Sequence, residues 1–234
     1  NKYSRQLSTF YGVLTVFCMH LNLAAQLSPE IRVSNEIKFC DLEFRLNDVS
    51  RNYLLDEIRS MSQNAAKRKL QNEKFNLVFP IVNQKFQKNN IPNDFRVLSI
   101  FDKVINDKGQ IENTEQNVFW CFDKPSANDV DLEVNNNIDE RKHIIRATDA
   151  AIIKLQRNQI LYKNWASVLL SMLCPKNKLQ GIPLKFDPSN LNKLSENNKI
   201  ILKFLAFKTL VEFDFNNRKN LQSEVVYEYP YSAG

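Results

Sequence analysis

The sequence is poor in glycine and histidine. Among its 234 residues only 4 are Gly and only 2 are His, at positions 20 and 143. Neither a GxGxxG nor a GxxxxGK[ST] pattern occurs, which excludes nucleotide-binding folds that depend on a glycine-rich phosphate loop. The four Cys include no CxxC pair, and of the two His only His143 lies outside the first 25 residues, so the ligand pattern of a zinc site is missing. We therefore expect no metal ion and no cofactor.

Charge of either sign is not concentrated in one stretch. The formal net charge is +6, and the Lys and Arg residues are scattered along the chain. Nucleic-acid-binding domains carry a clustered basic surface, so no nucleic-acid partner is expected. A modest positive charge suits any anionic partner, including cell-wall polymer, and identifies none of them.

The first 25 residues have the order of a secretory signal peptide. Lys2 and Arg5 precede the apolar run FYGVLTVFCMHLNLAA, which ends in small residues before Gln26. At about 16 residues this run is short for the ~20 that span a bilayer, so cleavage is favoured over a retained anchor. Phe17 is too large for the residue that precedes a lipidated cysteine, which argues against lipidation of Cys18. We expect an exported chain.

Apolar residues at helical spacing predict one mainly α domain over residues 51–220. Residues 26–50 are mixed and polar and predict an extended lead-in, whereas residues 221–234 predict a linker or a short strand. Two helical stripes are formed by Leu54, Leu55, Ile58 and Met61 and by Phe75, Val78, Phe79, Val82 and Phe86. Pro80 predicts a kink or a helix start, and Asn93 or Asp94 is expected to cap a helix after Pro92.

Three later segments also have helical patterns. They are IIRATDAAIIKLQ, NWASVLLSMLC and NKIILKFLAFKTLVEF. The last two are apolar nearly all round, which predicts buried central helices. Residues 103–117 are polar and lack a clear period, so they predict a loop.

Two segments contain candidate chemical groups. Phe95, Leu98 and Asp102 are spaced to lie on one helical face, where burial would favour the protonated carboxyl that can donate a proton. The alternative is an Asp at a helix end, exposed or paired with Lys103. In VFWCFDKP, no His or basic residue flanks Cys121, so a reactive thiol is not expected there.

Four segments follow one another in the order IPNDFRVLSIFD, VFWCFDKP, DLEVNNNIDERKHIIRATDAAIIKL and NWASVLLSMLC. This order resembles the catalytic domain of membrane-bound lytic murein transglycosylases of the D type, over about residues 75–215. Asp139, Glu140 and Arg141 are similar to the family's Asp-Glu-Arg turn into an Ala-rich helix. Trp120 and Phe122 fit its Gly-Leu-Trp-Gln-Phe segment.

The resemblance implies a mainly α, lysozyme-like fold of the goose-type and soluble lytic transglycosylase kind. In such enzymes a single Glu protonates the glycosidic oxygen between N-acetylmuramic acid and N-acetylglucosamine. Attack by the muramyl 6-hydroxyl then gives a 1,6-anhydro sugar, unlike the two-carboxylate scheme of most glycosidases. The resemblance further implies a periplasmic location, with peptidoglycan or envelope proteins as partners.

The departures from the family pattern fall where its chemistry lies. The catalytic Glu position falls on Asp102, whose carboxyl ends roughly 1.5 Å further back, and a displacement of ~1 Å can cost about a hundredfold in rate. The Gln of the aromatic segment falls on Cys121. The Ala-Tyr-Asn motif falls on Ser171, Met172 and Leu173, so polar groups that would surround a sugar are lost.

We therefore expect an inactive transglycosylase-like domain that binds peptidoglycan or serves as an envelope scaffold. Trp120, Phe122, Met172 and Leu173 are the expected groove positions, and Asp102 is the vestigial catalytic residue. Two alternatives remain. One is an active lytic transglycosylase that uses Asp102 as its acid/base, and the other is a protein-interaction subunit without sugar binding.

The resemblance also gives expectations for cysteine and tryptophan. It places Cys121 and Cys174 at the border of the cleft, and a disulfide between them is therefore hypothesised, with two buried free thiols as the alternative. Such a bond would close a loop of about fifty residues and contribute a few kcal/mol if unstrained. For Trp120 and Trp165, core packing is favoured over sugar contact.

Overall fold

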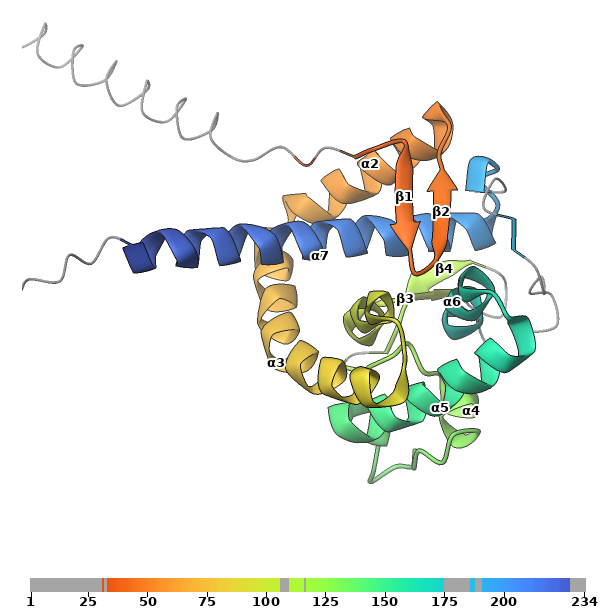
Figure 1. Ribbon diagram of the computed structural model, residues 1–234. Helices are drawn as coiled ribbons and strands as arrows, with labels where there is room; N and C mark the ends of the chain where they lie inside the picture. The colour runs from red at the N-terminus through yellow and green to blue at the C-terminus, as the bar shows by residue number, and fades with distance from the viewer. Residues whose placement is uncertain are drawn as a thin grey trace, which may run out of the picture. The chain divides into compact units, whose positions relative to one another are not determined.

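A computed structural model describes residues 31, 33–105, 110–115, 117–174, 186–187 and 191–227 (Figure 1). The chain divides into two compact units, residues 1–32 and 33–234. The helices and strands of the described ranges belong to the second unit. The expected signal peptide, residues 1–25, lies outside the described residues. The structure is mainly helical, which confirms the predicted class. None of the helices in the described ranges has both the length and the apolar character needed to span a bilayer.

A short hairpin replaces the extended lead-in. Strand β1 (Glu36–Phe39) pairs antiparallel with β2 (Leu42–Arg45), and Cys40 lies in the turn with a φ of 54°. Helix α2 (Asp48–Gln63) follows, and the side chain of Asn47 caps it by accepting a hydrogen bond from the Ser50 amide.

The two predicted apolar stripes lie in two separate helices. Asn64 separates α2 from α3 (Ala65–Asn89), and its side chain caps α3 by accepting from the Lys67 amide. Pro80 lies inside α3 on the exposed side. The helix curves along its length in Figure 1 and continues through the proline, so Pro80 does not start a helix.

The segment after Pro92 differs from its prediction. It forms a 3-10 helix, η1 (Asn93–Ile100), without a side-chain cap. Asp94 instead accepts a hydrogen bond from the Cys40 amide at 2.6 Å, which joins η1 to the β1–β2 turn. Strands β3 (Lys103–Ile105) and β4 (Ile111–Asn113) form a hairpin where a loop was predicted. Asp102 lies between η1 and β3, so its predicted place on a helical face was wrong.

Helices in the second half occur where they were predicted. After the short α4 (Lys124–Asn128) and the 3-10 turn η2 (Glu140–Lys142) come α5 (Ile144–Tyr162), α6 (Trp165–Leu173) and α7 (Glu196–Tyr227). Every residue of α6 from 166 to 173 is buried, and both α5 and α7 pack against it. The linker or short strand expected from residue 221 is helical as far as Tyr227.

The first and last helices of this unit lie side by side. Helix α2 packs along α7, as Figure 1 shows. Phe204 of α7 stacks edge-on against Phe39 and Phe101, with ring centroids 5.6 and 5.5 Å apart, and Phe39 also meets Phe95 at 5.0 Å. These ring contacts pack β1, η1 and α7 together in one core. Because Phe101 belongs to this core, the packing also positions Asp102, the next residue in the chain.

Candidate functional site

Arg141 is a buried cation at the centre of the region that resembles the transglycosylases. Its side chain is 1% exposed. The guanidinium donates to both carboxyl oxygens of Asp139, at 2.8 Å each, and to both of Glu115, at 2.7 and 3.1 Å. It also donates to the Phe122 carbonyl at 3.3 Å. These contacts join the turn before α5 to the aromatic segment.

The charges around Arg141 stabilise one another. The hydrogen bonds and charge of Arg141 hold the pKa of both Asp139 and Glu115 below their usual values. Burial alone would lower the pKa of Arg141, but its bonds to the two carboxylates raise it above its usual value. Arg141 thus holds the turn before α5 against Glu115 and against the backbone at Phe122.

The aromatic segment has an unusual backbone. Trp120 and Cys121 have φ angles of 61° and 56°, a left-handed conformation that side chains with a Cβ adopt at a cost of roughly 1–2 kcal/mol each. The Trp120 ring is completely buried, lies 5.5 Å from the Phe86 ring, and donates from Nε1 to the Thr148 hydroxyl at 3.1 Å. Its main role is therefore core packing, as favoured from the sequence.

All four expected groove positions are buried. The exposed fractions of Trp120, Phe122, Met172 and Leu173 are between 0 and 3%. A sugar ring stacks on an accessible aromatic face, and neither Trp120 nor Phe122 offers one. Trp165, for which core packing was also favoured, is half-buried, and its ring meets the Phe95 ring edge-on at a centroid distance of 5.3 Å. The positions brought together here form core and not an open groove.

The hypothesised disulfide is not formed. Cys121 and Cys174 are both buried, and neither is in a disulfide. The Cys121 thiol donates a hydrogen bond to the carbonyl of Phe101, the residue after η1, at 3.2 Å. Its contact is therefore with the backbone. Burial raises the pKa of Cys121 well above its usual value, and the Asp102 charge raises it further. The thiol therefore stays protonated and unreactive near neutral pH.

Asp102 forms an ion pair that the sequence did not predict. Its carboxyl lies 2.7 Å from the Lys67 ammonium of α3, and 37% of the Asp102 side chain is exposed. The alternative partner, Lys103, instead donates to the side-chain oxygen of Asn113 across the β3–β4 hairpin. A carboxylate neutralised by an ammonium group and open to water has the opposite surroundings from those that produce a general acid.

Further charged groups surround this ion pair. Lys203 of α7 is paired with Glu57 of α2 and lies over the Tyr53 ring, 5.6 Å from its centroid. Burial, followed by the Glu57 charge, raises the pKa of Tyr53. We call Lys67, Asp102, Lys103, Lys203 and Glu57 the Asp102 cluster. Its members come from α2, α3, the start of β3 and α7, and no local sequence pattern connects these elements, so sequence reasoning had no signal for it.

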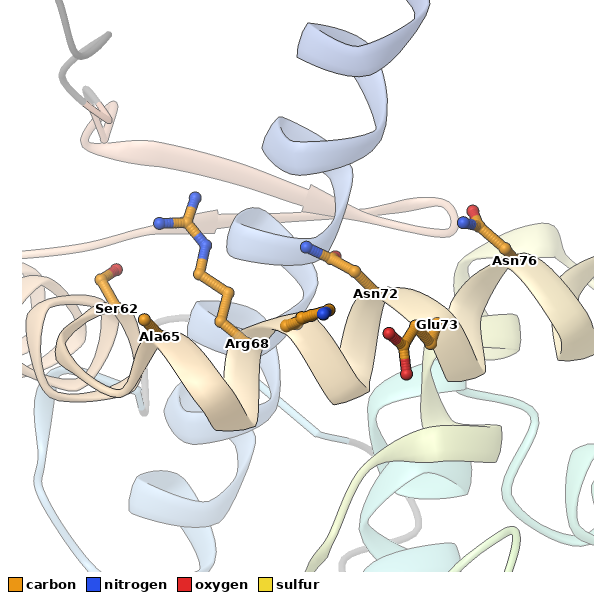
Figure 2. A pocket seen from close by; sticks show the side chains of 7 residues that line it. Ser62, Ala65, Arg68, Asn72, Glu73 and Asn76 are labelled. Atoms are coloured by element: carbon orange, nitrogen blue, oxygen red, sulfur yellow. The ribbon is translucent and has the colours of Figure 1, made fainter.

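A separate cavity of about 410 Å³ opens beside the α2–α3 junction. Figure 2 shows Arg68, Asn72 and Asn76 projecting to the same side of α3, with Glu73 turned away from them. Arg68 and Asn72 both donate to the buried carboxylate of Asp214 on α7. These bonds of Arg68 and Asn72 hold α3 against α7.

Exposed apolar side chains recur along the outer face of α5. Ile145, Ile153 and Ile160 are 46, 39 and 77% exposed, and their spacing of seven to eight residues places them on one helical face. The opposite face, with Ala147, Ala151 and Leu155, is buried against the core. We call the three isoleucines the α5 stripe.

Comparisons of the chain with protein-family models, curated proteins and solved structures find no match. The resemblance to lytic transglycosylases therefore stays a prediction that depends on the four sequence segments. Within the described ranges, no group of three or more His, Cys, Asp or Glu side chains is arranged to hold a metal ion.

Proposed function

We propose that the protein is a catalytically inactive, transglycosylase-like domain with a lysozyme-like fold, which serves as a scaffold in the cell envelope through contacts with protein. One observation carries the proposal: the carboxylate at the position of the family's Glu is neutralised by Lys67 at 2.7 Å, while the expected groove positions are buried. The order of segments supports the fold, because they form successive elements of the chain, of which α5 packs against the buried helix α6.

Loss of sugar binding at the groove follows from the same burial. Trp120 and Phe122 are both at most 3% exposed, so stacking on a sugar would require the core to open. Of the expected roles, the packing favours the interaction subunit over the peptidoglycan-binding module. An exported, periplasmic protein remains part of the proposal, since the segment that predicts it lies in residues 1–25.

The activity half of the proposal is tested with purified protein and murein sacculi. We expect no release of 1,6-anhydro muropeptides by mass spectrometry, because the only carboxylate at the required position is ion-paired and half-exposed. An active lytic transglycosylase serves as the positive control for the substrate. Anhydro product that appears with the wild type and disappears with Asp102→Asn would establish the active enzyme and refute the proposal.

The scaffold half depends on the α5 stripe. Arg146 and Arg157 are exposed and lie beside Ile153 and Ile160 on the helix surface, so the stripe has a basic edge. Arg146 is held by Glu140 at 2.9 Å and Arg157 donates to the Asp129 carbonyl at 3.0 Å, which orders both side chains. The complementary partner is a protein with an apolar surface bordered by carboxylates.

We expect the double variant Ile153→Asp/Ile160→Asp to lose this partner while remaining folded. Both side chains are exposed, so the substitutions remove little core packing, and their negative charges would repel an acidic edge. Cross-linking in envelope extracts, followed by mass spectrometry, compares this variant with the wild type. Leu77→Asp is the matched control, because Leu77 is 73% exposed on a different helix. Equal capture by all three proteins would contradict the scaffold role.

A further inference from the structure

The cavity beside the α2–α3 junction contains polar groups that the packing of the helices does not use. Its wall is formed by the end of α2 and the first half of α3. Its volume of about 410 Å³ lies in the range of pockets that hold small organic ligands. A single acetate or phosphate ion would fill only a part of this space. The cavity therefore has room for a ligand that contacts more than one of these groups.

Arg68 presents one edge of its guanidinium group to the cavity. Its Nε and Nη2 atoms both donate to the buried Asp214 carboxylate, Nε at 2.8 Å. A guanidinium group has five N–H donors, and this side-on contact uses two of them. No described residue accepts a hydrogen bond from Nη1, and the side chain is 32% exposed. The end-on edge, formed by Nη1 and the second N–H of Nη2, fits the two oxygens of a carboxylate.

Lys69 adds a second positive charge to the same wall. Its side chain is exposed, and no carboxylate among the described residues forms an ion pair with it. The acid that lines the cavity, Glu73, is turned away from Arg68 in Figure 2. Because Asp214 offsets the charge of Arg68, Lys69 supplies the charge that attracts an anionic group to the cavity.

Asn76 supplies a carboxamide further along α3. It is exposed, its side chain bonds to no described residue, and Figure 2 shows it on the same side of the helix as Arg68. A carboxamide has a donor and an acceptor, which match the C=O and N–H of a peptide group. Arg68 and Asn76 are eight residues apart in α3, which is about 12 Å along the helix axis. An extended peptide of about three or four residues spans that distance.

We propose that the cavity binds a short peptide in an extended conformation, with a carboxylate of the peptide at Arg68 and a peptide group at Asn76. Lys69 increases the affinity for the carboxylate, and Asp214 holds the guanidinium group in the orientation that the contact needs. Binding leaves the α3–α7 contact intact, because it uses the edge of Arg68 that Asp214 does not occupy. The inference is independent of the proposed function, since the α5 stripe lies on another helix.

The site is tested by titrating the full chain with N-acetyl-trialanine, which has a free carboxylate, and with its C-terminal amide, which has none. The readout is the NMR shift of the Asn76 side-chain amide, with sodium chloride at matched ionic strength as the reference. We expect a saturable shift with the acid. The amide should bind at least about tenfold more weakly, because it loses the charge-assisted contact with Arg68.

Sodium acetate is the third ligand of this test. It should bind more weakly than N-acetyl-trialanine, because it reaches only the Arg68 end of the cavity. Absence of a saturable shift with the acid would overturn the proposal. Equal affinity for the acid and its amide would exclude the carboxylate contact, and equal affinity for the acid and acetate would exclude the peptide contact. Either result would also overturn it.

Two variants of exposed residues test the contacts without loss of core packing. Asn76→Ala and Lys69→Met should remain folded, and each is expected to weaken binding of N-acetyl-trialanine several-fold. Gln84→Ala and Lys88→Met are the matched controls, because both residues are exposed on α3 outside the cavity. The controls should bind as the wild type does. Wild-type affinity in both Asn76→Ala and Lys69→Met would contradict the site as described.

A conservative change tests the second edge of Arg68. Arg68→Lys keeps a positive charge for Asp214 but has no planar group with two donor edges. We expect it to weaken binding of the acid at least about tenfold and to leave the weak binding of the amide unchanged. Urea unfolding shows whether the variant is folded. A folded Arg68→Lys protein that binds the acid as the wild type does would contradict the end-on contact.

Discussion

Replacing Arg141 by Met is expected to lower the free energy of unfolding by about 3 kcal/mol. The substitution removes the hydrogen bonds of a 1% exposed cation and leaves Asp139, the Phe122 carbonyl and Glu115 without their shared partner. Urea unfolding measures the change. Arg146→Met is the matched control, since Arg146 forms an exposed ion pair with Glu140, and its effect on stability should be far smaller than that of Arg141→Met. Similar losses in both variants would contradict the role of Arg141 as a buried clamp.

The Arg141 effect should also depend on pH. Arg141 lowers the pKa of Asp139 and Glu115 in the folded state, whereas unfolded carboxyls titrate near 4. The stabilisation is therefore fully present above about pH 4 and is lost as the pH falls through the depressed folded-state values. The difference in unfolding free energy between the wild type and Arg141→Met should shrink on acidification below about pH 4. A difference that stays constant there would show that the two carboxylates do not carry it.

Replacing Trp120 by Ala is expected to cost about 3–5 kcal/mol of unfolding free energy. The ring is completely buried against Phe86, and its removal leaves a cavity in the core. Trp120→Phe keeps most of the apolar contact but loses the Nε1 bond to Thr148, so its cost should be clearly smaller. Urea unfolding of both variants checks the order. If Trp120→Ala cost less than about 1 kcal/mol, the ring would not be the core residue that the structure shows.

A double-mutant cycle isolates the polar contact of Trp120. Thr148→Val is nearly the same size and removes the hydroxyl that accepts from Nε1 at 3.1 Å. When it is combined with Trp120→Phe, the two losses should be less than additive, because both remove one hydrogen bond. Full additivity would mean that the bond contributes nothing measurable.

Helices α5, α6 and α7 were predictable from the sequence, because their long apolar patterns fit a helix that is buried on one side or all round. In α6, eight consecutive buried residues leave no polar face, and such a run can only lie inside the core. The turn at Asp139, Glu140 and Arg141 was singled out by its resemblance, although the contacts of Arg141 with Glu115 and Phe122 were not foreseen. Glu115 lies 26 residues before Arg141.

The site was less predictable than the helices because tertiary contacts decide it. The spacing of Phe95, Leu98 and Asp102 fits a helical period, but η1 is a 3-10 helix that ends at Ile100, so Asp102 leaves the apolar face. Its partner Lys67 lies in α3, 35 residues earlier in the chain, and no local sequence pattern connects the two residues. The cysteine pairing depended on an expected cleft, whereas the packing turns Cys121 toward the Phe101 carbonyl.

The same limit explains the two missed hairpins. Strands β1 and β2 have four residues each, and β3 and β4 have three, so an alternating pattern has too few positions to be recognised. Polar residues between 103 and 117 were interpreted as a loop for this reason. The β3–β4 hairpin nevertheless positions Lys103 opposite Asn113, whose side chain accepts a hydrogen bond from it.

The packing of α2 along α7 has a consequence for biosynthesis. The two helices lie near opposite ends of the described chain. Helix α2 therefore leaves the ribosome long before α7, against which it packs, has been synthesised. At about 5–20 residues per second, the interval is roughly seven to thirty seconds. During that delay Leu54 and Ile58, which are 0 and 4% exposed in the finished molecule, face solvent. Until α7 is complete, the nascent chain therefore exposes an apolar helix face that the folded protein buries.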